Sequence, residues 1–143
     1  MSETKKGPVV DLSLRWERDL VFQGRVGERD LTLDGNGREG VSPVQALAFA
    51  LASCMASDVV LVLTRGRQPV EGLTAALHAE RAPEDPRRLL RVALRFDVAG
   101  DVPLDKVQRA IDLSREKYCS VWHSLRPDIE LVVTPVTFPA SRT

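Results

Sequence analysis

Hydrophobic and polar residues alternate in short segments near the N-terminus, and this period of two is typical of half-buried β-strands. Residues 9–16 form the first such segment, and residues 20–23 and 30–34 form two more. One face of the first segment carries the apolar side chains Val10, Leu12, Leu14 and Trp16. The charged linkers between the segments fit hairpin turns, and Asp-Gly-Asn-Gly at residues 34–37 marks a break. We therefore expect three strands joined by hairpins.

The strongest local pattern begins a long helix at Pro43. Ser42 is an N-cap residue, proline stands at the first helical position, and Gln45 follows three residues after the cap, which makes a capping box. The apolar run that follows predicts a helix to Thr64 or Arg65, ended by glycine. Because this helix is apolar on nearly all sides, we expect it to be buried on most of them.

The same apolar run is about 18 residues long, which is at the edge of membrane-spanning length. Ser53, Ser57 and Asp58 interrupt it, and alanines supply much of its apolar character. These features favour a central core helix, or one packed against its twin in a dimer. No membrane association is predicted.

The C-terminal half contains two long strands, a helix and a final strand. Residues 72–80 and 89–98 alternate with one covered and one solvent-facing side. Residues 103–113 have helical spacing, a short helical turn is expected through Leu125, and residues 129–134 predict the last strand. The predicted order is β-β-β-α-β-β-α-β, an α+β fold in which two sheets wrap the hydrophobic helix.

The composition is that of one globular domain. With 143 residues, 43% hydrophobic and 28% charged, the chain is long enough to bury a core. We assign residues 9–138 to this domain and residues 1–8 to a flexible tail. Twenty acidic and twenty basic residues balance, so no net charge attracts nucleic acid or an anionic membrane. Residues 1–10 lack the apolar segment of a signal peptide, and we expect a cytoplasmic protein.

Candidate chemistry rests on two cysteines, Cys54 and Cys119. Two cysteines are too few for a disulfide scaffold, and no cysteine–histidine spacing indicates zinc, so no metal is predicted. No phosphate loop, dinucleotide fingerprint or nucleophile elbow occurs, and no cofactor is predicted. Two thiols are the minimum for reversible sulfur redox chemistry, but two inert buried cysteines would give the same pattern.

A reactive Cys54 needs a source of positive charge, because burial in apolar surroundings opposes the thiolate. It lies about three turns into its helix, beyond the reach of the N-terminal dipole. Asp58, one turn further on, would oppose a thiolate if it lay close. The natural donor is an arginine of the first hairpins, Arg18 or Arg25. Cys119 precedes a short helix, whose N-terminus is expected to lower the pKa of its thiol.

The remaining polar candidates have simpler interpretations. His78 and His123 stand apart from any acid–serine or metal-ligand pattern, and surface or packing roles are predicted for both. Asp58 is expected to be paired or solvated.

Three segments of the chain resemble the OsmC/Ohr family. The family's central helix is similar to residues 42–47 (SPVQAL), 52–54 (ASC) and 58–60 (DVV). The turn into its next strand resembles residues 67–73 (RQPVEGL), and the region of its second cysteine resembles residues 110–114 (AIDLS) and 116–121 (EKYCSV). The resemblance covers about residues 10–134. It is closest to the general OsmC-like branch rather than to the organic hydroperoxide resistance proteins proper.

This resemblance implies an intertwined homodimer, with the cysteine-bearing helices packed centrally, and a thiol peroxidase that reduces organic hydroperoxides in oxidative stress defence. It implies that Cys54 is the peroxidatic residue, which becomes a sulfenic acid, and that Cys119 resolves it to a disulfide. An external dithiol, in one branch a lipoylated protein, would restore both thiols. Arg18 best matches the family arginine that orients the thiolate.

One departure from the family pattern lies beside this site. A glutamate that follows the helix proline in the family is replaced here by Val44 and Gln45. Glutamine can hydrogen-bond to Arg18 but cannot form an ion pair with it, and the capping box offers Gln45 a purely structural role. Two other functions therefore stay open: a non-catalytic dimer that binds a small hydrophobic ligand, and a dithiol redox sensor.

Overall fold

The computed structural model describes residues 5–139, and its elements form the α+β fold expected from the sequence. Two three-stranded sheets, one long helix and three shorter helical segments make up the described chain. The described chain divides into two compact units, one up to Leu47 and one from Ala48 onward. The assignment of residues 9–138 to a single domain stays a prediction.

The first unit holds an antiparallel sheet in the order β1-β2-β3, made of Ser13–Arg18, Val21–Val26 and Arg29–Asp34. Its two hairpin turns contain residues with positive φ, Asp19 at 46° and Gly27 at 59°. Glycine adopts this left-handed region without steric cost, which explains its place in the second turn.

The predicted first strand, residues 9–16, is only partly correct. Residues 9–12 have no strand structure, and β1 runs instead from Ser13 to Arg18. Its partner β2 has six residues, and pairing starts at Ser13 with Arg25. Alternation alone therefore overestimated the strand at its N-terminal end, because the length of a ladder depends on the partner strand as well.

The connection from β3 to the long helix is held by Asp34. This side chain is 2% exposed, and its carboxylate accepts hydrogen bonds from the backbone N–H groups of Asn36, Arg38 and Glu39 at 2.8, 3.1 and 3.0 Å. Three amide donors stabilise the ionised carboxylate and fix the loop that leads into the helix.

Helix α1 spans Pro43–Arg65, as predicted from the capping box. The Ser42 hydroxyl accepts a hydrogen bond from the backbone N–H of Gln45 at 3.2 Å. In return, the side-chain oxygen of Gln45 accepts one from the backbone N–H of Ser42 at 2.9 Å. These reciprocal bonds satisfy amide groups that a helix start otherwise leaves free.

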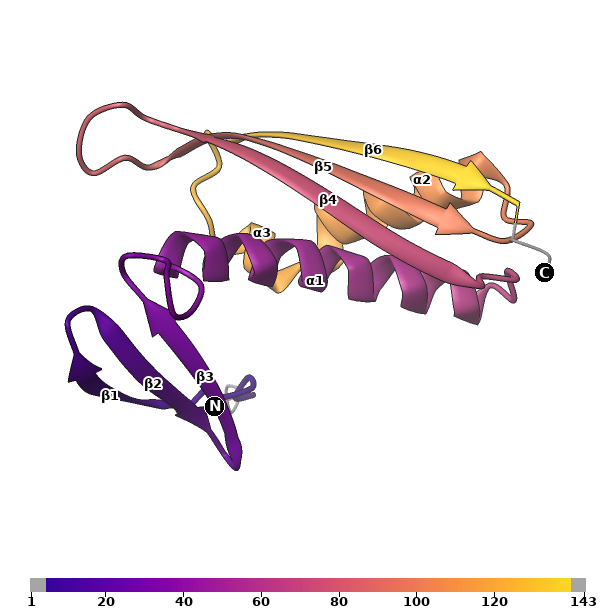
Figure 1. Cartoon of the computed structure of the whole chain (residues 1–143). Helices are drawn as coiled ribbons and strands as arrows, with labels where there is room; N and C mark the ends of the chain where they lie inside the picture. The colour runs from indigo at the N-terminus through magenta and orange to yellow at the C-terminus, as the bar shows by residue number, and fades with distance from the viewer. Residues whose placement is uncertain (1–4, 140–143) are drawn as a thin grey trace, which may run out of the picture. The chain divides into compact units, whose positions relative to one another are not determined.

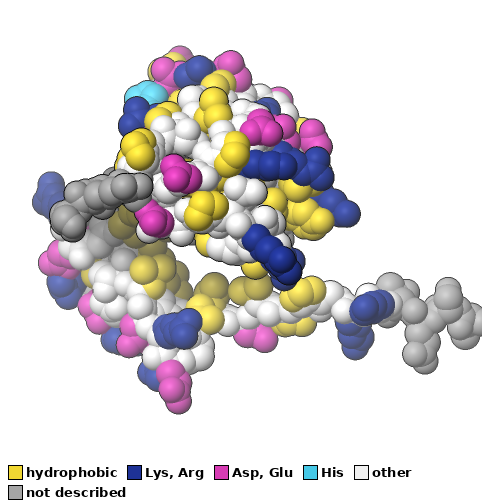
Figure 2. Space-filling view, turned by 90° about the vertical axis from the view of Figure 1, so that its right-hand side faces the viewer, with side chains coloured by type: hydrophobic (Ala, Val, Ile, Leu, Met, Phe, Trp, Pro, Cys, Tyr) yellow, Lys and Arg dark blue, Asp and Glu magenta, His cyan; other side chains and the backbone are white. Residues whose placement is uncertain are grey.

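The expectation that α1 is buried on most sides is wrong for the single chain. Its buried residues form one stripe with a spacing of four, Leu51, Met55, Val59 and Leu63. On other sides of the helix Phe49 is 65% exposed and Leu61 46% exposed. Hydrophobic side chains lie open beside charged ones on the molecular surface (Figure 2). By length and apolar composition Pro43–Arg65 also meets the criterion for a membrane span, a criterion that core helices of soluble proteins meet as well.

The second unit is built on the sheet β4-β5-β6, made of Gly72–Arg81, Leu89–Ala99 and Glu130–Phe138. Strands β4 and β5 are antiparallel, whereas β5 and β6 are parallel. Alternate residues of β5 form the centre of the core, namely Val92, Leu94, Phe96 and Val98. Helices α1 and α2 cover this face of the sheet (Figure 1).

A parallel pair of strands needs a crossover, and here the crossover contains three helical segments. Helix α2 (Leu104–Leu113) runs directly into a π-helical turn, η1 (Ser114–Tyr118), and the short helix α3 (Ser120–His123) follows. Val107, Ala110 and Ile111 anchor α2 in the core. The crossover thereby places Cys119 in the link between η1 and α3.

Candidate functional site

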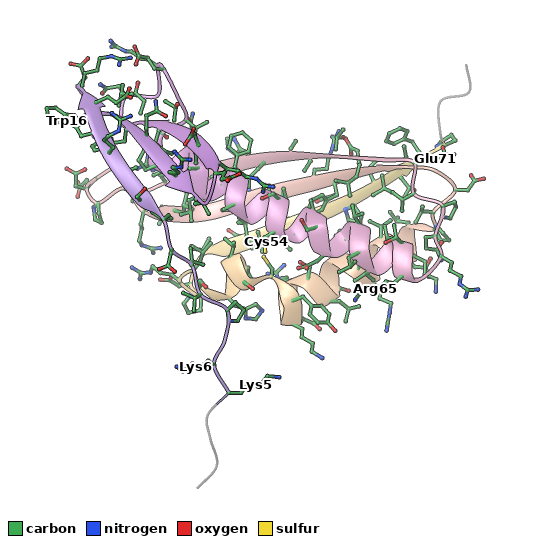
Figure 3. All side chains as sticks on the ribbon, turned by 90° about the horizontal axis from the view of Figure 1, so that it is seen from below. Lys5, Lys6, Trp16, Cys54, Arg65 and Glu71 are labelled. Atoms are coloured by element: carbon green, nitrogen blue, oxygen red, sulfur yellow. The ribbon has the colours of Figure 1, made fainter. Side chains whose placement is uncertain are left out.

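Three reactive side chains of the second unit converge. The sulfur atoms of Cys54 and Cys119 and a carboxylate oxygen of Asp58 all lie within 4.8 Å of one another. Figure 3 shows Cys54 in the middle of α1, with its sulfur between this helix and the C-terminal helices. We refer to Cys54, Asp58 and Cys119 below as the dithiol cluster.

Two elements supply the cluster. Cys54 and Asp58 are one turn apart on α1, where residues i and i+4 lie on the same face. Cys119 comes from the crossover and has an extended backbone, with φ −72° and ψ 99°, between two helical segments. The sequence predicted the first pair from helical periodicity, and the packing of the crossover adds the third member.

Ser114 binds the carboxylate of the dithiol cluster. It is fully buried, and its hydroxyl donates a hydrogen bond of 2.7 Å to Asp58 Oδ2. The wide turn η1 positions it, and closes with a bond of 2.8 Å from the Cys119 amide to the Ser114 carbonyl. Such π-helical turns occur frequently at functional sites. Sequence reasoning missed Ser114 as a site residue, because only the fold brings it to Asp58.

Cys119 is a protonated thiol at neutral pH. Burial is the main cause that raises the pKa of Cys119 to about 11, and the nearby Cys54 and Asp58 raise it further. The backbone N–H of Trp122, which donates a hydrogen bond of 3.3 Å to the Cys119 sulfur, acts in the opposite direction. The expectation that the helix N-terminus lowers this pKa is therefore wrong. The amide of α3 does act in that direction, but the loss of solvation outweighs one hydrogen bond.

The arginine predicted to serve Cys54 is engaged in the first unit. Arg18 forms ion pairs with Glu39, through a short contact, and with Glu17 at 3.4 Å. Glu39, from the loop before α1, is therefore a carboxylate partner of Arg18 within the first unit.

The other candidate site residues make local contacts. Arg25 donates a hydrogen bond of 3.0 Å to the Gly27 carbonyl within its own hairpin, and Gln45 is engaged in the capping box. His78 lies on the surface, 4.0 Å from Glu80, and the His123 ring lies 2.9 Å from the Arg115 carbonyl oxygen. Neither histidine belongs to the dithiol cluster.

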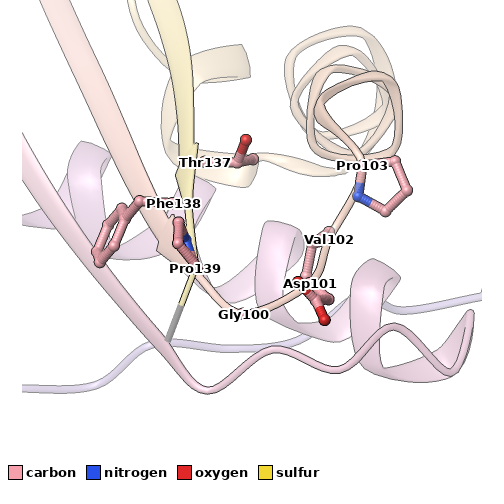
Figure 4. A pocket seen from close by; sticks show the side chains of 7 residues that line it. All are labelled: Gly100, Asp101, Val102, Pro103, Thr137, Phe138 and Pro139. Carbon is pink, nitrogen blue, oxygen red and sulfur yellow. The ribbon is translucent and has the colours of Figure 1, made fainter. Parts of the chain in front are cut away.

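An open pocket of the second unit lies apart from these cysteines. It measures about 510 Å³ and is lined by Gly100, Asp101, Val102, Pro103, Thr137, Phe138 and Pro139 (Figure 4). The pocket is formed where β5 turns into α2 and where β6 ends. None of the residues of the dithiol cluster lines it.

Solved structures share the architecture of this chain. A hypothetical protein from Aquifex aeolicus VF5 superposes with a TM-score of 0.88 at 23% identity, over 94% of this chain and 100% of that chain. An OsmC like protein from Mycoplasma pneumoniae gives 0.78 at 15% identity, over 95% and 100%. An organic hydroperoxide resistance protein from Elizabethkingia anophelis gives 0.72 at 16% identity, over 94% and 100%. At these identities the likeness shows the fold.

Sequence comparison gives the family. Protein YhfA of Escherichia coli K12 is 40% identical over 111 residues, which cover 76% of this chain and 83% of YhfA. The model of the family described as OsmC-like protein matches residues 35–134, a stretch that includes α1, the β4-β5 pair and the crossover with both cysteines. The chain therefore belongs to the OsmC-like protein family.

Proposed function

We propose that this protein is a cysteine-dependent thiol peroxidase that reduces organic hydroperoxides, with Cys54 as the peroxidatic and Cys119 as the resolving residue. The observation that carries the proposal is the approach of the two sulfur atoms to within 4.8 Å across two different elements. A peroxidatic and a resolving cysteine must lie close enough to form a disulfide, whereas packing alone does not require two core cysteines to be neighbours. Membership of the OsmC-like family supports the proposal as well, and the fold is shared with an organic hydroperoxide resistance protein.

The reaction proceeds in three balanced steps. The Cys54 thiolate attacks the distal oxygen of ROOH, and with one proton this yields Cys54 sulfenic acid and the alcohol ROH. The Cys119 sulfur then attacks the Cys54 sulfur, which forms the disulfide and releases water. An external dithiol exchanges with this disulfide, becomes oxidised itself, and returns both protein thiols.

The position of Cys119 suits the resolving step. A disulfide requires the two sulfur atoms to be about 2.05 Å apart, so at least one of the two cysteines must move toward the other. Cys54 lies in the middle of a 23-residue helix, whereas Cys119 lies in an extended link between η1 and α3. A short link between two helical turns can change its backbone angles more readily than the middle of a long helix, so we assign the movement to Cys119.

The peroxidatic step requires a cation. Asp58 lies beside Cys54, and a carboxylate near a thiol disfavours the thiolate. Arg18 is proposed to supply the positive charge, and its pairing with Glu39 restrains the guanidinium. For Gln45 and Arg25 the capping box and the hairpin contact favour structural roles.

The exposed apolar side of α1 supports a homodimer. Phe49, Val60 and Leu61 are 65%, 38% and 46% exposed, and soluble proteins rarely leave such residues clustered on one helix in water. We propose that a second copy of the chain covers this side, as the OsmC-like family implies, and that the protein acts in the cytoplasm with a dithiol reductant, which a lipoylated protein could supply.

The test follows consumption of cumene hydroperoxide by reduced protein with dihydrolipoamide as the reductant. We expect Cys54→Ser to abolish turnover. Cys119→Ser, mixed with the hydroperoxide in the absence of dihydrolipoamide, should consume one equivalent and hold a sulfenic acid on Cys54 that dimedone traps. Ser57→Ala, an exposed position on the same helix, is the matched control and should keep wild-type turnover. Equal turnover in wild type and Cys54→Ser would refute the peroxidase.

Two further measurements address the other functions. A ligand-binding dimer would show a co-purified hydrophobic molecule by native mass spectrometry and no peroxide consumption. A redox sensor would form the Cys54–Cys119 disulfide with peroxide but turn over slowly with any dithiol, and its oxidised form would differ from the reduced form in hydrogen exchange.

A further inference from the structure

The dithiol cluster has the donor set of a metal site. Two sulfur atoms and one carboxylate oxygen converge within 4.8 Å, from residues that are half-buried (Cys54, Asp58) or fully buried (Cys119). Cysteine thiolates are soft ligands that select Zn²⁺ over Mg²⁺ and Ca²⁺, and carboxylates also ligate Zn²⁺. Sequence motifs did not predict this site, because two of its members lie one helical turn apart and the third lies on a distant crossover, rather than in a cysteine–histidine motif.

We propose that the reduced Cys54–Cys119 pair and Asp58 form a binding site for a thiophilic divalent cation, of which Zn²⁺ best fits the three ligands. The inference does not rest on the peroxidase function, since it requires only the geometry of the cluster.

The distances suit tetrahedral coordination after a small contraction. With Zn–S bonds of about 2.3 Å and Zn–O bonds of about 2.0–2.2 Å, tetrahedral ligand atoms lie about 3.5–3.8 Å apart. The cluster is already within 4.8 Å, so each ligand atom needs to move by about 1 Å or less. Three protein ligands leave the fourth position of the tetrahedron open to water or to a small ligand, as in catalytic rather than structural zinc sites.

Charge balance favours the cation strongly. With both thiols deprotonated the three ligands carry three negative charges, and among the ion pairs of residues 5–139 none involves Asp58. A divalent ion at the centre of the cluster attracts all three ligands and so offsets the repulsion between the two thiolates and the carboxylate. Both effects are strong because the site is half-buried and Coulomb interactions are less screened there than in water. Binding displaces the two thiol protons to solvent.

Groups around the cluster hold the ligands in place. The buried Ser114 hydroxyl binds Asp58 Oδ2, which orients the carboxylate and leaves its other oxygen for the ion. The Trp122 amide donates to the Cys119 sulfur, and this hydrogen bond would also stabilise a metal-bound thiolate. Such supporting contacts typically contribute 10–100-fold to metal affinity.

The site and the peroxidase chemistry exclude each other. Each needs the same two sulfur lone pairs, so a bound cation protects both thiols from peroxide, and a disulfide removes both thiolate ligands. The cation would thus be held only by the reduced protein and released on oxidation.

The test titrates Co²⁺, a spectroscopic substitute for Zn²⁺, into the reduced, chelator-treated full chain without peroxide or oxygen. We expect one ion per chain, with thiolate-to-cobalt charge-transfer absorption and the visible bands of tetrahedral coordination, all reversed by Zn²⁺. Cys54→Ser and Cys119→Ser should each lower the charge-transfer absorption. Asp58→Asn and Ser114→Ala should weaken binding by at least about tenfold. Asp112→Asn, at an exposed carboxylate of α2, is the control and should bind as wild type does.

Several results would overturn the site. These are a wild-type spectrum without charge-transfer absorption, unchanged binding after either cysteine substitution, equal binding by the oxidised protein, and equal weakening in Asp112→Asn. Circular dichroism of each metal-free variant separates loss of ligand from loss of fold. When the peroxidase assay is run with added chelator and the metal titration without peroxide, failure of one proposal leaves the other standing.

Discussion

At the scale of single residues, the hydrogen bond from Ser114 to Asp58 supports the dithiol cluster. It spans 56 positions in the sequence and ties the crossover to α1. Ser114→Ala leaves a half-buried carboxylate without this donor, and we expect the free energy of unfolding to fall by about 1–2 kcal/mol, since bonds to charged groups contribute more than neutral ones. Urea denaturation monitored by circular dichroism measures the change.

Ser57→Ala is the control for this substitution. The Ser57 hydroxyl is exposed and bonds only to the Ser53 carbonyl of its own helix, so its loss should change stability by less than about 0.5 kcal/mol. Equal effects of the two substitutions would mean that the bond to Asp58 contributes nothing specific.

The same residues mark what sequence could and could not reveal about the site. The pairing of Cys54 with Asp58 on one helical face follows directly from their spacing of four. The approach of Ser114 and Trp122 depends on how the crossover packs, and nothing in the local sequence of either residue encodes it. The raised pKa of Cys119 was missed for a related reason: a helix start is visible in the sequence, whereas complete burial is a tertiary property.

At the scale of elements, the loop between β3 and α1 depends on the ionised form of Asp34. The amides of Glu39 and Asn36 lower the pKa of this carboxyl below its ordinary value of about 3.9. Because the folded pKa is the lower one, the stabilisation is present above about pH 4 and is lost as the pH falls through the folded pKa. We expect Asp34→Asn to lower the thermal midpoint at pH 7, and the difference from wild type to shrink below pH 4.

Thermal unfolding scans at pH 7, 5, 4 and 3 provide this measurement. Asp30→Asn, an exposed position on the same strand, is the matched control and should follow the wild-type pH profile. A constant difference between wild type and Asp34→Asn across the series would contradict the assignment.

Elements with strong end signals were predicted better than those without. The capping box at Ser42 and the glycine after Arg65 fixed both ends of α1, because each end has its own chemistry. The start of β1 carries no such signal, so alternation placed it at residue 9 rather than at Ser13. The π-helical turn η1 was not predicted, since its hydrogen-bond pattern has no distinct period in so short a stretch.

At the scale of the whole molecule, the exposed apolar residues of α1 are where we propose that two copies of the chain associate. Phe49 is the most exposed of them, so Phe49→Glu places a charge where we propose that the second copy packs. We expect sedimentation equilibrium to give twice the chain mass of 15.8 kDa for wild type and a large monomer fraction for the variant. Leu104→Glu, on the exposed side of α2, is the control and should remain dimeric. A monomeric wild type would rule out the homodimer.

The parallel pairing of β5 with β6 also sets an order of events in time. This ladder joins Arg91 to Glu130, so it cannot close before the crossover between them has been synthesised and has folded back. Cys119 lies inside that crossover, and Cys54 leaves the ribosome well before it. A growing chain therefore carries Cys54 without its partner, and the two thiols can meet only after the crossover has been synthesised and has packed against α1.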